Sequence, residues 1–270
     1  MAGVAAPPAG SPPRTGWRAI LGGPQGALTI GLTLITLSVA TESLVITAIM
    51  PAIVRDIGGV SLYGLAFSAF FLAGLASIPI AGWGVDRFGP SVPFAATISI
   101  FLVATSIAAL SPSMPLLVLA RAGQGLGAAA QFTITQSTIA RAYPVEARVR
   151  VLSLMSATWV LPGLIGPSLG AGIATLFGWR WAFGAILVPA LLAAGITYPR
   201  LRGVGGSAAT PSRPSLRRPV QVAVGTGLFI TGLTSLTWWS ALLVIAGLAM
   251  AIEALAHILP PGALRAARGL

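Results

Sequence analysis

The sequence predicts an all-α membrane protein, and three observations lead to this prediction. Hydrophobic residues make up 56% of the 270 residues, charged residues make up only 8%, and the mean hydropathy is +0.91. Soluble globular domains do not have this composition. Continuous apolar runs of near membrane-spanning length recur along the chain. They lack the alternation that barrel strands require, and irregular backbone cannot face lipid, so the spans must be helices.

Eight apolar segments supply the expected helices. They cover residues 27–49, 62–81, 92–110, 116–139, 151–177, 182–198, 220–236 and 238–259. The connection between the sixth and seventh segments is long and polar, so it divides six helices from a final pair. The first residues are rich in Pro, Ala and Gly and carry only two charges, so they cannot bury a core.

These boundaries predict five regions in the chain. The expected order is a disordered cytoplasmic tail (1–24), a six-helix bundle (25–198), a cytoplasmic linker (199–219), a helix pair (220–260) and a short cytoplasmic end (261–270).

The distribution of charge predicts the orientation of the helices. All sixteen basic residues are arginines. If the N-terminus is cytoplasmic, thirteen of them lie on the cytoplasmic side, Arg55 and Arg180 lie outside, and Arg121 lies within a span. This asymmetry follows the positive-inside rule. We therefore expect a multi-pass protein of the inner (plasma) membrane with both termini in the cytoplasm. The same distribution explains the net charge of +11 without a nucleic-acid partner.

The residue types that the sequence lacks exclude several classes of catalytic and metal-binding site. The sequence contains no Lys, Asn or Cys and only one His, which excludes a P-loop lysine, a thiolate and a disulfide and leaves no convincing set of metal ligands. Gly166, Ser168 and Gly170 fit the G-x-S-x-G pattern of a hydrolase, but no strand precedes them and His257 is the only histidine. We therefore expect no enzymatic activity, no cofactor and no metal.

Arg121 is a costly residue in an apolar, glycine-studded run. A charge near the centre of a spanning helix costs roughly 2.5–3.5 kcal/mol on insertion scales. Glu42 in the first segment and Arg121 in the fourth both fall in the outer half of the membrane, about one helical turn apart in depth. We expect them to pair across the bundle interior, with Gln124 adding a polar contact.

The expected pair suggests a role in coupling. Burial and a neighbouring guanidinium act in opposite directions on the proton affinity of a carboxyl group. The hypothesis is that Glu42 binds a proton or a cationic substrate and that Arg121 biases its release. The alternative is a static ion pair that specifies packing.

Several motifs accompany these charges. A glycine-framed Asp-Arg pair of the form G-x-x-x-D-R-x-G follows the second segment and is expected to form a short cytoplasmic loop, at Gly82, Asp86, Arg87 and Gly89. Arg121, Gln124 and Gly125 form R-x-x-Q-G. Glu42 begins a D-x-T-I-V-x-x-x-L-P-like run in which the acid is conservatively replaced and the Thr position holds Leu44. A glycine-proline motif lies in the fifth segment, with Pro162 at its leading Gly position: Gly163, Gly166, Pro167 and Gly170. The sixth segment begins with W-R-W-x-F, at 179–183.

Together these motifs resemble the major facilitator superfamily, in particular its fourteen-helix drug/proton antiporter branch, over about residues 27–260. The resemblance implies a six-helix bundle of two inverted three-helix repeats plus two further transmembrane helices. It also implies a second six-helix half, absent from this chain, as a partner, so we expect a truncated transporter. The expected activity is export of small amphipathic or drug-like molecules across the lipid bilayer, driven by protons and the proton gradient.

The resemblance also assigns roles to residues. Arg121 is implicated in proton transfer, while Asp86 and Arg87 brace the cytoplasmic gate, with Arg141 or Arg148 as the partner of Asp86. A solvated turn is the alternative. Gly166 and Pro167 are expected to bend the fifth helix. The resemblance links this bend to export, and the alternative is a bend that serves only helix packing. An importer or facilitator of a nutrient or metabolite, and a fragment inactive on its own, remain alternatives for the whole chain.

Overall fold

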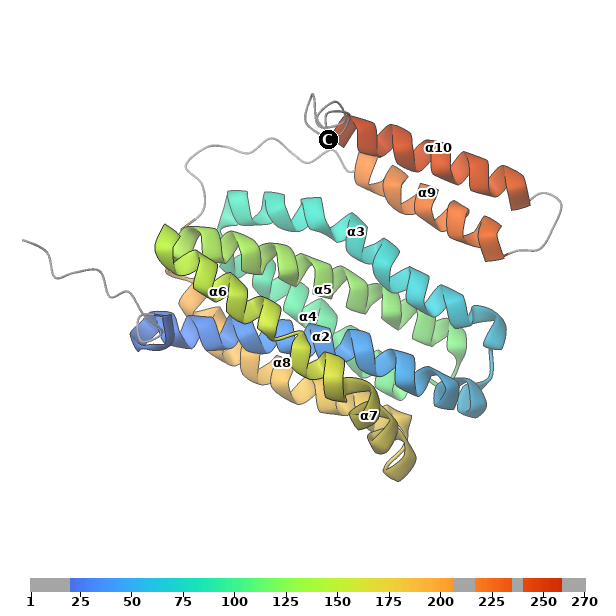
Figure 1. Cartoon of the computed structure of the whole chain (residues 1–270), viewed down its shortest axis with the longest axis horizontal. Helices are drawn as coiled ribbons and strands as arrows, with labels where there is room; N and C mark the ends of the chain where they lie inside the picture. The colour runs from blue at the N-terminus through green and yellow to red at the C-terminus, as the bar shows by residue number, and fades with distance from the viewer. Residues whose placement is uncertain (1–19, 206–216, 235–239, 259–270) are drawn as a thin grey trace, which may run out of the picture.

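The computed structural model describes residues 20–205, 217–234 and 240–258 (Figure 1). Most of the predicted tail, the middle of the predicted linker and the predicted C-terminal end lie outside these residues. Ile20, at the end of the predicted tail, is folded rather than disordered: it is buried, and its carbonyl accepts a hydrogen bond from the Thr29 hydroxyl at 2.6 Å. Burial of the apolar Ile20 side chain favours an ordered position for this residue.

The described residues are helical nearly throughout and contain no strand, which confirms the predicted all-α class. The helices are α2 (Gly23–Ile57), α3 (Tyr63–Phe88), α4 (Ser91–Leu110), α5 (Met114–Ala142), α6 (Val145–Ala157), α7 (Val160–Leu176), α8 (Trp179–Leu201), α9 (Arg217–Thr234) and α10 (Ser240–Ile258), with a short 3-10 turn η1 (Val60–Leu62).

Five stretches of the described chain are long and apolar enough to cross a membrane. They are Gln25–Ile57, Val60–Phe88, Ser91–Leu110, Val145–Leu176 and Trp179–Leu201. The fourth predicted segment, α5, has 29 residues and is longer than two of these stretches, but it is less apolar and is not among them. Five of its polar side chains are buried in the bundle: Arg121, Gln124, Gln131, Thr135 and Thr138.

The fifth predicted segment lies in one stretch long enough to span a membrane, Val145–Leu176, but it is not one unbroken helix. α6 ends at Ala157 and α7 begins at Val160. Pro162 accounts for the interruption, because its ring clashes with the carbonyl four residues earlier and it has no N–H to donate to that carbonyl. Pro162 therefore lies in the first turn of a new helix, where proline is tolerated. The helix then continues through Pro167, so the break precedes the expected bend.

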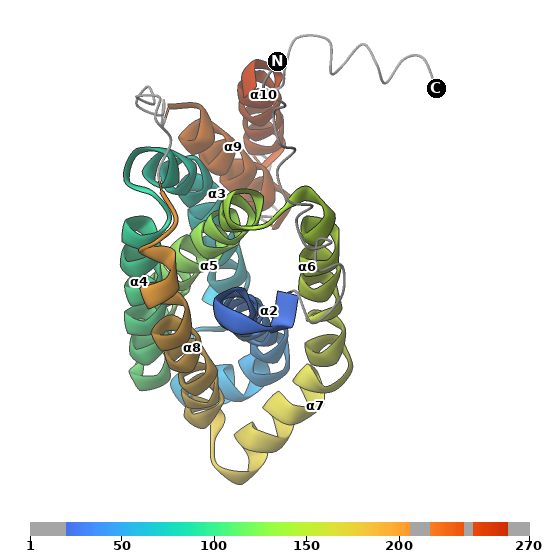
Figure 2. The same cartoon turned by 90° about the vertical axis from the view of Figure 1, so that its left-hand side faces the viewer.

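The first three helical segments make the same contacts as the second three. The contact of α3 with α5 corresponds to that of α7 with α2, and the contact of α4 with α5 corresponds to that of α8 with α2. The contact of α4 with α8 corresponds to itself. Replacing α2, α3 and α4 by α5, α6–α7 and α8 converts each contact into another of the set. Two inverted three-helix repeats have this relation. Figure 2 looks along the helices and shows α2 between α8 and α6–α7.

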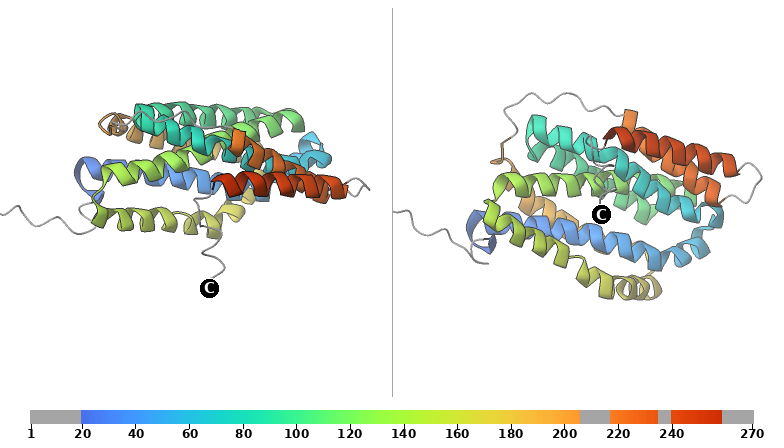
Figure 3. Two further views of the ribbon diagram at one scale, coloured as in Figure 1. Left: turned by 90° about the horizontal axis from the view of Figure 1, so that it is seen from above. Right: turned by 45° about the horizontal axis from the view of Figure 1, so that its top comes forward.

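α9 and α10 form a hairpin that lies against α3, outside the six-segment bundle (Figure 1, Figure 3). Their crossing is close because glycines face each other. A Cβ added to Gly225 would lie 2.8 Å from the Gly247 carbonyl oxygen, and one added to Gly232 would lie 2.8 Å from the Val244 side chain. Small residues at such crossings let helix backbones approach in a membrane.

Candidate functional site

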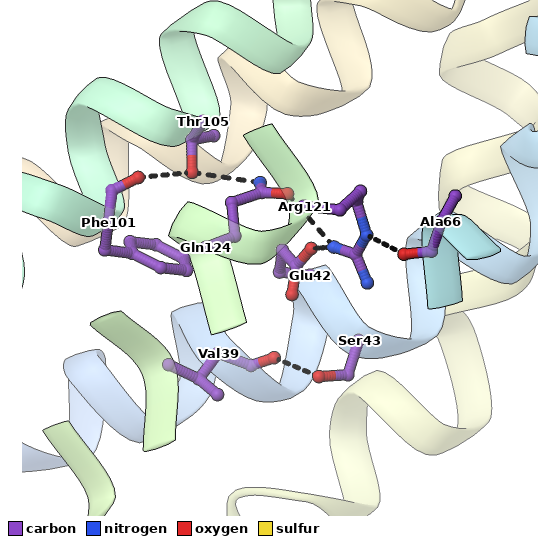
Figure 4. A network of polar contacts seen from close by, with 8 residues as sticks. All are labelled: Val39, Glu42, Ser43, Ala66, Phe101, Thr105, Arg121 and Gln124. Carbon is purple, nitrogen blue, oxygen red and sulfur yellow. Dashed lines mark hydrogen bonds and ion pairs between the residues drawn. The ribbon is translucent and has the colours of Figure 1, made fainter. Parts of the chain in front are cut away.

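A buried ion pair joins the first and fourth predicted segments. Arg121 on α5 donates through Nη1 to Glu42 Oε1 on α2, and the same nitrogen donates to Gln124 Oε1 at 3.1 Å (Figure 4). Glu42 and Gln124 have no exposed surface, and Arg121 is 1% exposed. The predicted pairing of Glu42 with Arg121, and the predicted contact of Gln124, are confirmed as geometry.

The polar network continues onto α4. Gln124 donates through Nε2 to Thr105 Oγ1 at 3.1 Å, and the Thr105 hydroxyl donates to the Phe101 carbonyl at 2.7 Å. This chain of donors fixes the orientation of the Gln124 amide, so that its oxygen faces Arg121. The third helix of the bundle, α4, therefore holds Arg121 indirectly, through Gln124.

α3 encloses the opposite side of the guanidinium. Arg121 donates through Nε to the Ala66 carbonyl at 3.4 Å, and its guanidinium carbon lies 4.3 Å from the centre of the Phe70 ring. The approach depends on Gly125, because a Cβ at this position would overlap the Phe70 carbonyl. The glycine of R-x-x-Q-G therefore brings the ring of Phe70 within cation–π distance of the arginine.

The two carboxylate oxygens of Glu42 are unequally satisfied. Oε1 accepts from Arg121, while Oε2 is buried and has no hydrogen-bond partner among the described residues. A proton could bind to Oε2 without any rearrangement of the site, because a proton needs almost no additional space. A cationic substrate would have to enter a fully buried position and displace Arg121. Direct access of a cationic ligand to Glu42 is therefore closed in this structure.

The Asp-Arg motif lies in a helix, not in a turn, which corrects the expected loop. Gly82, Asp86 and Arg87 belong to the last two turns of α3, and only Gly89, at a φ of 73°, leaves the helix. Glycine adopts this left-handed conformation without the Cβ penalty of other residues. It therefore ends α3 and directs the chain into α4.

Asp86 has one of its two expected partners. Its Oδ1 accepts from Arg141 Nη2 at 2.6 Å, which ties the ends of α3 and α5 together. Arg148 instead donates to the carbonyls of Ala140 and Tyr143, at the end of α5. Arg87 is exposed, and its guanidinium lies 5.6 Å from the Phe88 ring.

The glycines of the fifth segment lie in two environments. A Cβ added to Gly170 would lie 2.9 Å from the Val45 side chain, and one on Gly166 would lie 3.5 Å from Leu44. These two glycines therefore bring α7 against α2, directly after Glu42. Gly163 has nothing within 4 Å of an added Cβ, and neither has Gly82 of the Asp-Arg motif.

A third ion pair, at the end of the bundle opposite to Asp86 and Arg141, was not predicted. Asp56 accepts from Arg180 at 2.6 Å and from the Trp179 indole at 2.9 Å, and Arg180 also donates to the Ser111 carbonyl at 3.2 Å. This cluster joins the ends of α2, α4 and α8. The sequence carried a signal for it, since Arg55 and Arg180 were the only arginines expected outside and Asp56 was an acid beside one of them.

These features define a polytopic helical membrane protein with an ion pair inside its bundle. Residues 31–262 match the family model of the Major Facilitator Superfamily. The chain belongs to this superfamily of transporters, which confirms the resemblance stated from its motifs.

The curated relatives that it matches include multidrug efflux proteins. It is 29% identical over 154 residues to the multidrug efflux pump SdrM of Staphylococcus aureus, covering 57% of this chain and 34% of that protein. It is 32% identical over 165 residues to the multidrug export protein EmrB of Haemophilus influenzae, covering 61% of this chain and 32% of that protein. The chain thus spans about a third of the length of these relatives.

Solved structures share the fold. A bacterial homologue of the human lysosomal transporter Spinster, inward-facing and unoccupied, aligns with a TM-score of 0.52 at 18% identity, over 84% of this chain and 60% of that chain. A POT family peptide transporter in an autoinhibited state aligns with a TM-score of 0.52 at 14% identity, over 83% of this chain and 51% of that chain.

Proposed function

We propose that this chain is the first six-helix half, with its additional helix pair, of a proton-coupled exporter of small amphipathic or drug-like molecules. The observation that carries the proposal is the buried Glu42–Arg121 pair. An ionisable pair kept inside a membrane bundle is expensive, and such residues typically mark ion or proton paths. The efflux relatives support export, and the exporter would work with a second six-helix half in the inner membrane, both termini cytoplasmic.

The packing suggests how protonation would act. Arg121 is held by α3 and by its own helix through Ala66, Phe70 and Gln124, whereas Glu42 belongs to α2, which packs mainly on α7 and α8. Protonation of Glu42 removes its charge, and the attraction across the interior falls with it. The α2–α7–α8 group is then less strongly tied to the α3–α4–α5 group. Such a release lets two rigid helix groups rock when a proton arrives.

The test measures flux in vesicles that contain this chain together with a second six-helix half. A pH gradient is imposed, and transport of ethidium and of the neutral dye acridone is followed by fluorescence. Glu42→Gln is expected to abolish gradient-driven flux of any transported dye while exchange without a gradient persists. Glu146→Gln is the matched control, because Glu146 is exposed on α6. Gradient-driven flux that survives Glu42→Gln contradicts the coupling role. Flux directed only inwards favours an importer.

A further inference from the structure

A cavity of about 330 Å³ lies between α2, α5 and the break that separates α6 from α7. It is lined by Thr36, Phe132, Thr135, Gln136, Leu152, Met155, Ser156 and Trp159. Trp159 is the residue at the break itself, so the interruption of the fifth segment forms one wall. Cavities of this size hold small organic ligands, and they combine an apolar lining with a few placed polar groups.

The lining is aromatic and polar but carries no charge. Phe132 and Trp159 are 58% and 42% exposed, so their rings are accessible from the opening. Thr135, Gln136 and Ser156 supply uncharged hydrogen-bonding groups. Glu42, the acid of the bundle interior, is fully buried and bonded to Arg121. The cavity therefore offers no counter-charge to a cation, and an ion transferred into it without a partner would lose its hydration.

An adjacent pocket of about 20 Å³ shares Thr36, Phe132, Thr135 and Trp159 with this cavity and is also lined by Gln131. Gln131 is 1% exposed, and its Nε2 donates to the Phe94 carbonyl at 3.2 Å and to Thr97 Oγ1 at 2.9 Å. A carbonyl only accepts, so these bonds fix which end of the amide is the NH₂. The remaining atom, Oε1, is a buried acceptor with no partner in the described chain. Such an atom is best satisfied by an N–H or O–H donor.

We infer that this cavity binds an uncharged, planar aromatic molecule that carries a hydrogen-bond donor. Trp159 and Phe132 contact the ring system, and Gln131 Oε1 accepts from the donor. The inference rests on the proposed function for its place in transport, and it narrows the substrate class from drug-like molecules in general to neutral ones at this site. Binding itself requires neither a pH gradient nor a second half.

The experiment titrates three dyes with the same three-ring skeleton into the purified chain in lipid nanodiscs. Acridone is neutral with an N–H donor, N-methylacridone is neutral without the donor, and N-methylacridinium is a permanent cation. Empty nanodiscs correct for partition into lipid. We expect acridone to bind saturably, N-methylacridone to bind about fivefold more weakly because it lacks one hydrogen bond, and the cation to bind at least about tenfold more weakly than acridone.

Variants assign the binding to this cavity. Trp159→Leu is expected to weaken acridone binding about tenfold, and Trp159→Phe to restore most of it, since an aromatic contact contributes about 0.5–1.5 kcal/mol beyond area. Trp181→Leu is the matched control, because Trp181 is a tryptophan on α8 that lies outside the cavity and is even more exposed than Trp159. Gln131→Met keeps the length of the side chain and is expected to remove the preference for acridone over N-methylacridone. Size-exclusion profiles establish that each variant is folded.

The results separate this inference from the proposed function. Equal affinity for the cation and for acridone, or no effect of Trp159→Leu, overturns the inference even where Glu42-dependent flux is found. Binding with the expected ranking upholds it even where no variant of Glu42 changes flux, in which case the proposed coupling fails alone.

Discussion

Gly127 offers a sharp test of the packing that holds the polar network. It lies on α5 where α4 crosses, and a Cβ added to it would lie 2.6 Å from Phe101 Cβ and 2.9 Å from the Thr97 carbonyl oxygen. Carbon atoms in contact lie about 3.5–4.0 Å apart, so Gly127→Ala forces α4 and α5 apart by about 1 Å. The same movement stretches the bond from Gln124 to Thr105, which is already 3.1 Å long.

The magnitude follows from overpacking of a close contact. Inserting one methyl group into a filled interface costs about 1–3 kcal/mol. For a chain of this size each kcal/mol lowers the melting temperature by about 2–4 °C, so we expect Gly127→Ala to lower it by about 2–12 °C. The assay is thermal unfolding in detergent followed by tryptophan fluorescence.

Gly163→Ala is the matched control for this prediction. Gly163 is also helical and has nothing within 4 Å of an added Cβ. Alanine is favoured over glycine in a helix by roughly 0.5–1 kcal/mol, so this variant is expected to melt at the same temperature or slightly higher. Equal stability of Gly127→Ala and wild type, or equal losses in both variants, refutes the reasoning from helix contact.

Three further predictions concern charges and topology. Arg121→Leu leaves Glu42 buried and unpaired and is expected to destabilise by about 3–5 kcal/mol, whereas adding Glu42→Leu recovers most of the loss; denaturant unfolding measures both. A double-mutant cycle with Asp86→Asn and Arg141→Gln is expected to give a coupling below about 1 kcal/mol, because both side chains are partly exposed. Since the sequence has no Cys, Ser61→Cys provides a unique thiol, and an impermeant maleimide is expected to label it in intact cells. Labelling only after permeabilisation contradicts the proposed orientation.

The central ion pair was predictable from the sequence because the cost of a buried charge and the depth of each residue follow from the individual helices. Arg121 in an apolar run needs a partner, and helix rise places Glu42 at a similar depth. Five of the eight predicted spans were predictable from apolar length alone, whereas α5 is less apolar. The polar face of α5 fits this account, because Gln124 and Gln131 are buried in the bundle.

Other features depended on backbone geometry or on distant contacts. The break before Val160 arises from a missing N–H at Pro162, and hydropathy does not register a lost hydrogen bond. Within the Asp-Arg motif only Gly89 has a positive φ, and the residues before it stay helical. Asp56 and Arg180 are far apart in sequence, and only the packed ends of α2 and α8 bring them together.

The break between α6 and α7 lies within the membrane, because neither helix is long enough to cross it. With 13 and 17 residues, the two helices are about 20 and 26 Å long, and neither alone crosses a hydrocarbon layer of about 30 Å. The interruption at Thr158–Trp159 therefore lies at membrane depth, although both residues keep right-handed helical dihedral angles. Pro162 offers no N–H to the carbonyl four residues earlier, at Thr158, so this carbonyl must be satisfied by protein or water at that depth.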